Sequence, residues 1–136
     1  MTFQISFGHC HSYDAREGLA IRAVLIASGR DVSCIAYIDT GASVCLFQRE
    51  LADTLELDLE TGHRINLSTL TGSLPAYGHE VTLQTLDVAL HTTVYFASTP
   101  GLQRNLLGRA GWLHQLKLGI VDHDEFIYLS HYDDEA

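Results

Sequence analysis

The apolar residues of this chain fall into many short runs, and turn-forming residues recur about every eight to twelve positions. The clearest pair of runs is 19–27 and 32–38, which are separated by Ser28, Gly29, Arg30 and Asp31. Two short apolar runs joined by a glycine-containing turn are typical of a β-hairpin. The pattern therefore predicts an all-β domain, shaped like a closed barrel, with one or two short helices.

The rest of the chain is read in the same way from periodicity and turn signals. Residues 8–18 are polar and predict a loop, whereas residues 74–90 form one long, largely alternating stretch. Further strands are predicted at 2–7, 64–70, 91–97, 119–121 and 126–129, and short helices at 48–57 and 108–116.

The length of 136 residues is that of one average domain. We expect a single domain over 1–136, with an N-terminal extension at 1–18 and an acidic, solvated tail at 130–136. A hydrophobic fraction of 46% with only 2 prolines excludes a disordered or collagen-like chain. A net charge of −9 argues against nucleic acid as a partner.

Three sequence features bear on compartment and cofactors. No apolar stretch approaches about 18 residues, and no basic segment precedes an apolar run at the N-terminus, so we expect neither a membrane anchor nor a secretory signal. The cysteines, Cys10, Cys34 and Cys45, are odd in number and are expected to be reduced thiols of a cytoplasmic protein. His9 and His11 flank Cys10, but no second cluster completes a tetrahedral metal site, so we expect no metal and no cofactor.

One segment carries the chemistry: the apolar run 32–38 leads directly into Asp39, Thr40, Gly41, Ala42 and Ser43. A carboxylate at the end of a buried strand calls for a structural or functional explanation, because burying a charge without a partner costs free energy. Asp39 could simply cap a turn, as aspartate often does. A phosphate loop of the actin and sugar-kinase type also uses Asp-x-Gly-x-Ser/Thr, but it needs two large α/β lobes for which this chain is too short.

The segment from Asp39 to Ser43 resembles the catalytic motif of the retroviral-type aspartic proteases, the retropepsins. The resemblance extends along the chain, because further elements of that family follow in order. Residues 65–78 resemble the flap hairpin, with Thr71 and Gly72 near its tip, and residues 94–97 resemble the strand before the second conserved motif. The second motif itself is similar to Leu106, Leu107, Gly108 and Arg109, followed by Trp112.

The resemblance implies that one protomer supplies one catalytic Asp39, so that a homodimer is needed to bring two together. One carboxylate would then activate a water that attacks the peptide bond, while the partner's protonated carboxyl group would hold the carbonyl oxygen. Thr40 and Gly41 would support the site, and Leu106, Leu107, Gly108 and Arg109 would pack beneath it. An extended peptide or protein substrate would meet Ala42, Ser43, Thr69, Leu70, Thr71, Gly72, Ser73 and Leu74.

The chain departs from the family pattern at two positions that often carry acids there, which are Ser43 and Ala110 here. The ionic link from such an acid to Arg109 is therefore absent, and a different partner for Arg109 is expected. The acidic tail would also repel its symmetry mate, so we expect the termini not to interleave as in viral dimers. These departures keep a second hypothesis open: a retropepsin-like dimerisation or peptide-binding domain with little or no proteolysis.

Overall fold

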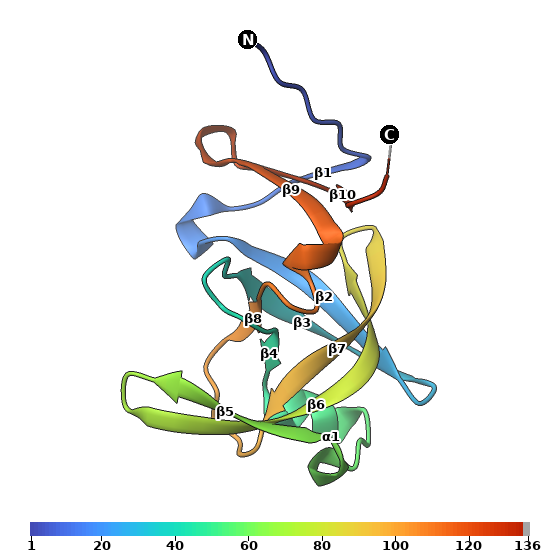
Figure 1. Cartoon of the computed structure of the whole chain (residues 1–136), viewed down its shortest axis with the longest axis vertical. Coiled ribbons are helices and arrows are strands. Elements are labelled where there is room, and N and C mark those ends of the chain that lie inside the picture. Colours follow the sequence, from blue (N-terminus) through green and yellow to red (C-terminus); the bar gives the residue numbers. More distant parts are fainter. Residues whose placement is uncertain (135–136) are drawn as a thin grey trace.

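The computed structural model describes residues 1–134, and its main body is a seven-stranded sheet that curls into a barrel (Figure 1). The strand order is β2-β3-β8-β4-β7-β6-β5, and an additional pairing of β2 with β6 closes the barrel and leaves β5 outside it. The strands are β2 (Ala20–Ala27), β3 (Arg30–Ile38), β4 (Leu46–Phe47), β5 (His63–Thr69), β6 (Gly72–Thr85), β7 (Val88–Ala97) and β8 (Asn105–Leu107). The predicted all-β barrel is confirmed.

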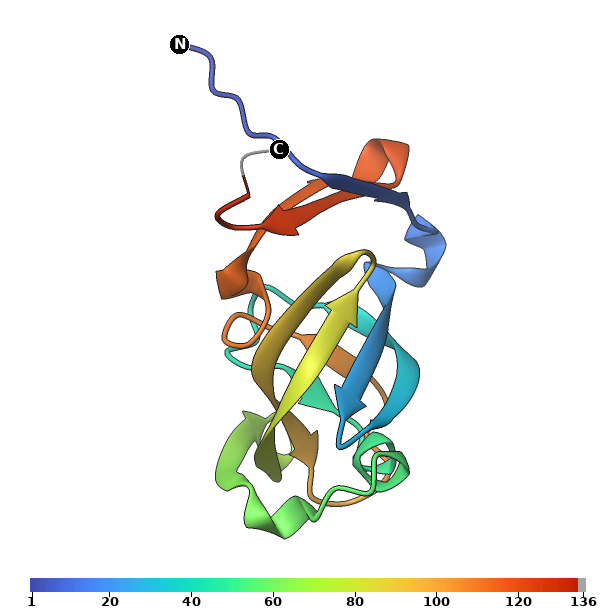
Figure 2. The ribbon, with the colours of Figure 1, turned by 90° about the vertical axis from the view of Figure 1, so that its right-hand side faces the viewer.

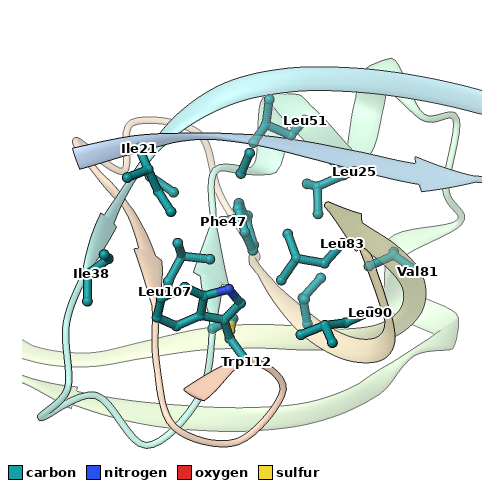
Figure 3. Close-up of a cluster of buried hydrophobic side chains, with 14 of the residues drawn as sticks. Ile21, Leu25, Ile38, Phe47, Leu51, Val81, Leu83, Leu90, Leu107 and Trp112 are labelled. Carbon is teal, nitrogen blue, oxygen red and sulfur yellow. The ribbon is translucent and has the colours of Figure 1, made fainter. Parts of the chain in front are cut away.

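The core lies inside this barrel (Figure 3). Strand β2 shows why, because Ile21, Ala23 and Leu25 alternate inward and are buried. Trp112 is fully buried among these apolar side chains, and its indole Nε1 donates a hydrogen bond to the Thr85 hydroxyl at 2.9 Å. The single tryptophan therefore ties the segment after β8 to the end of β6.

A second, three-stranded sheet in the order β1-β10-β9 sits at one end of the barrel (Figures 1 and 2). Its strands are β1 (His9–Ser12), β9 (Leu116–Val121) and β10 (Phe126–His131), so the predicted C-terminal hairpin is confirmed. The strand predicted at 2–7 is wrong, and β1 begins inside the segment predicted to be a loop. Phe3 and Ile5 alternate but are exposed, because no neighbouring strand pairs with them.

The described residues 1–134 contain one α-helix, α1 (Arg49–Thr54), which confirms the prediction at 48–57 with a shorter span. The helix predicted at 108–116 is wrong: this segment contains only a 3₁₀ turn, η3 (Leu113–Gln115). Gly111 adopts a φ of 95°, which ends regular helix there. Other 3₁₀ turns are η1 (Ala15–Glu17), η2 (Leu59–Thr61) and η4 (Asp122–Asp124). Among these residues, no helix has the length and apolar character needed to cross a membrane.

The alternating stretch at 74–90 is not continuous, because the chain reverses between Thr85 and Val88. These two residues pair across a two-residue turn in which Leu86 has a φ of 54°. A leucine in the left-handed region is uncommon, so the sequence carries little signal for this turn. Strands β6 and β7 then run back together over ten paired positions and form the longest hairpin of the barrel.

Candidate active site

Asp39 lies immediately after β3, where the strand enters a tight loop. Its backbone N–H donates to the Leu107 carbonyl oxygen at 3.0 Å, which anchors the loop to β8. The Gly41 N–H donates to the Asp39 Oδ1 atom at 3.0 Å, and the Ala42 N–H donates to the Asp39 carbonyl oxygen at 3.1 Å. The half-buried carboxylate is therefore held by the turn that follows it.

The segment after β8 supports this loop from beneath. The N–H groups of Arg109 and Ala110 donate to the carbonyl oxygens of Ala42 and Ser43, both at 2.9 Å. A Cβ atom on Gly108 would lie 2.1 Å from the Val44 carbonyl oxygen, so only glycine allows this approach. The second motif of the sequence thus packs against the first, as the resemblance implied.

The Cys45 side chain fills the space between these two segments. Its Sγ atom accepts a hydrogen bond from the Gly108 N–H at 3.4 Å, and the residue is fully buried. Burial raises the pKa of the Cys45 thiol to about 11, so the group stays neutral near pH 7. Cys45 is therefore part of the hydrophobic core.

A cavity of about 530 Å³ opens beside Asp39, between its loop and the hairpin formed by β5 and β6. Predicted site residues from both sides meet there: the loop supplies Asp39, Gly41, Ala42 and Ser43, and the hairpin supplies Thr69 and Leu74. Residues 65–78 therefore lie opposite the carboxylate, where a flap would be expected.

Other predicted residues lie outside this cavity wall. Thr40 is exposed on the loop, and Leu70, Thr71, Gly72 and Ser73 form the exposed end of the hairpin. Because Thr69 pairs with Gly72, the two-residue tip is Leu70 and Thr71, and Gly72 lies next to it as the first residue of β6. The Leu70 side chain is fully exposed.

The cavity wall also contains residues that the sequence interpretation missed. These are Val44, Leu46, Asn66, Leu67 and Ser68. Leu106 was predicted to pack beneath the site, but it lines the cavity, whereas Leu107 is buried beneath Asp39 as predicted. Successive residues of a strand point to opposite faces, so alternation could have separated the two leucines.

Two remaining predictions concern charged groups. Arg109 is exposed and forms no ion pair with any of residues 1–134, so none of these residues is the substitute partner that was expected.

The histidines that flank Cys10 lie close to one carboxylate. Asp87 Oδ2 lies 3.2 Å from His11 Nε2 and 3.7 Å from His9 Nδ1. No group of three or more His, Cys, Asp or Glu side chains within 1–134 is arranged to hold a metal ion.

A family profile described as aspartyl protease matches residues 26–110, which include the Asp39 loop, the flap hairpin and β8. The chain belongs to this aspartyl protease family. The comparison with curated protein sequences gives no significant match.

Solved structures place the fold among the retropepsin-like proteins. A retropepsin-like aspartic protease from Rickettsia conorii superposes with a TM-score of 0.61 at 16% identity, over 93% of this chain and 100% of that one. The EIAV protease, solved in complex with an inhibitor, superposes with a TM-score of 0.55 at 17% identity, over 73% of this chain and 88% of that one. The predicted retropepsin fold is confirmed.

Proposed function

We propose that two copies of this chain form an aspartic endopeptidase, with one Asp39 from each copy at the shared site. The observation that carries the proposal is the single Asp39 carboxylate, held by the Gly41 N–H at the wall of a cavity beneath a flap-like hairpin. The sequence holds one Asp-Thr-Gly, so two carboxylates require two chains. The membership in the aspartyl protease family supports the same chemistry.

The reaction proposed for this site needs no group beyond the two carboxyls. Two neighbouring carboxylates do not both ionise easily, so the pair retains one proton. The ionised Asp39 takes a proton from water, which attacks the peptide carbonyl carbon, and the protonated Asp39 donates a hydrogen bond to the carbonyl oxygen. The exposed Thr40, next to Asp39, is free to contact the second copy across the two-fold axis.

The cavity suits an extended peptide as the substrate. Val44, Leu46, Leu67, Leu74 and Leu106 give it apolar walls, and the flap hairpin can add backbone hydrogen bonds and exclude water. We propose no role for nucleic acid or membrane. We also propose a cytoplasmic location, which the three free thiols of Cys10, Cys34 and Cys45 support.

The arrangement of the two copies is proposed to differ from the interleaved viral sheet. β1 pairs with β10 of its own chain over His9–Ser12, and β10 also pairs with β9, so β1 has one partner and β10 has two. Within residues 1–134 Arg109 forms no ion pair that could support the site, which favours a second candidate function, a retropepsin-like dimerisation or peptide-binding domain with little proteolysis.

The substitution Asp39→Asn separates the two candidates. We expect it to reduce cleavage of a proteome-derived peptide library at mildly acidic pH by at least about 1,000-fold, because a carboxamide neither takes the water proton nor shares one. The thermal midpoint should stay within a few degrees of the unmodified protein. The matched control is Asp31→Asn, an exposed aspartate on the same strand, β3, which should retain full activity.

Retained cleavage in Asp39→Asn would refute the assignment of this residue. An unmodified protein that binds peptides but cuts none across pH 4–8 would favour the non-proteolytic candidate.

A further inference from the structure

Arg104 directly precedes β8, the strand whose Leu106 lines the candidate active site. Tyr37 is the second-last residue of β3, which ends at Ile38, directly before Asp39. In the parallel pairing of β3 with β8, Tyr37 lies opposite Leu106, which lines the cavity. The Arg104 guanidinium carbon lies 4.3 Å from the centre of the Tyr37 ring.

Arg104 therefore contacts Tyr37, Tyr37 lies opposite Leu106, and Leu106 and Asp39 line the same cavity. Successive same-side residues of a strand are about 7 Å apart, which is also the spacing between same-side residues of an extended peptide. Arg104 precedes the cavity-lining Leu106 by two residues, so it lies about 7 Å along the chain from the cavity wall, where a side chain of a bound peptide can approach it.

The Arg104 charge is available to a ligand. Its side chain is exposed, and it makes no ion pair with the described residues 1–134. Stacking on the Tyr37 ring fixes the plane of the guanidinium while leaving its N–H groups free along the edges. The Tyr37 ring lies beside Gly18, because a Cβ on that residue would be at ordinary contact distance, 3.7 Å from Tyr37 Cε1.

The net negative charge of the chain determines what the Arg104 cation can contribute to binding. The chain has 17 acidic against 8 basic residues, so its overall field repels acidic peptides. Arg104, which makes no ion pair within residues 1–134, locally reverses that repulsion, and its planar guanidinium matches a carboxylate.

We propose that Arg104, positioned by Tyr37, is a specificity residue that selects an acidic side chain within two positions of the scissile bond, next to an apolar side chain in the Leu106 cavity. The inference rests on the proposed function, because it takes the Asp39 cavity as the place where peptides bind.

The test uses pairs of peptides that differ only by Glu or Gln at each of the two positions on either side of a known cut. We expect the unmodified protein to cleave the best Glu peptide with a KM about tenfold lower than its Gln partner, a typical gain for one charge-assisted contact. Arg104→Gln should bring the two KM values within twofold by raising the KM of the Glu peptide about tenfold. Arg104→Glu should invert the preference toward a Lys peptide.

Arg30→Gln is the matched control, because it removes the same charge from the far end of β3, where Arg30 pairs with Glu56 at 2.6 Å. It should retain the preference for Glu. A purely structural role of Arg104 would lower activity on both peptides equally, and a role in dimer formation would appear as a weakened dimer in sedimentation. Either outcome, or an equal Glu and Gln preference in the unmodified protein, overturns the proposal.

Binding provides a readout that does not depend on catalysis. The same labelled Glu and Gln peptides are titrated by fluorescence anisotropy against Asp39→Asn and against Asp39→Asn combined with Arg104→Gln. A Glu preference that disappears only in the double variant supports Arg104 even if no peptide is cleaved, in which case the proteolytic function alone has failed. Binding that is independent of Glu in both proteins overturns the assignment.

Discussion

The Asp39 loop and the flap hairpin face each other across one cavity, but the chain supports them in opposite ways. The loop is fastened to a distant segment, because Ala42 and Ser43 accept hydrogen bonds from Arg109 and Ala110. The flap is a ladder in which β5 pairs with β6 up to Thr69 and Gly72. Beyond that pair, its tip ends in a fully exposed leucine, Leu70.

The Asp39 loop and the flap hairpin therefore depend on different interactions. The position of the Asp39 carboxylate is fixed by packing within one chain, which is what a preorganised site requires. The apolar Leu70 side chain is not covered by any of residues 1–134, so it is free to contact a substrate or a second copy. Substitutions beneath the loop should therefore affect folding, whereas substitutions at the flap tip should affect activity.

The largest effect is expected from Gly108→Ala. The added Cβ would lie 2.1 Å from the Val44 carbonyl oxygen and 2.8 Å from that of Ala42, both backbone atoms that must move. We expect the free energy of unfolding in urea to fall by about 3 kcal/mol or more. In the flap, the matched variant Gly72→Ala meets open space and only a φ of 139°, so it should cost about 1 kcal/mol. Equal losses would contradict the comparison.

A smaller, pH-dependent effect is expected at Cys45. Burial raises the pKa of this thiol to about 11, above its value in the unfolded chain, so its stabilising contribution is complete below pH 9 and is lost as pH rises through 11. The free energy of unfolding should fall with a slope of up to about 1.4 kcal/mol per pH unit from this group. Cys45→Ser, which does not ionise, should flatten that slope between pH 9 and 11. An unchanged slope would show that the thiol is not held neutral.

Local signals predicted much of the fold and the catalytic loop. The hairpin of β2 and β3 was visible because two apolar runs flank Ser28 and Gly29, and α1 because Leu51, Ala52 and Leu55 share one face. Asp39 stood out as a carboxylate at the end of an apolar strand. Each of these signals lies within a few residues of the structure it specifies.

The failures share a different physical cause, which is long-range pairing. The alternation at 2–7 suits a strand, yet only residues 9–12 find a partner, in β10. The segment after Gly108 has apolar residues at helical spacing, but hydrogen bonds to Ala42 and Ser43 draw its backbone away from a helix. The cavity positions of Asn66 and Ser68 likewise follow from how the flap folds over the loop. None of these partners is adjacent in sequence, so no local sequence pattern predicts these contacts.

The smallest effect on stability is expected at the flap tip, with Leu70→Ala. The side chain is fully exposed, so the free energy of unfolding should change by less than about 0.5 kcal/mol. If the tip covers bound substrate, kcat/KM for an apolar peptide should nevertheless fall about tenfold, as expected for a lost apolar contact and poorer exclusion of water. Thr71→Ala changes the other tip residue and should stay within twofold in kcat/KM. A loss of stability in Leu70→Ala, or equal losses of activity in both variants, would show that the tip is supported by its own chain, as the Asp39 loop is.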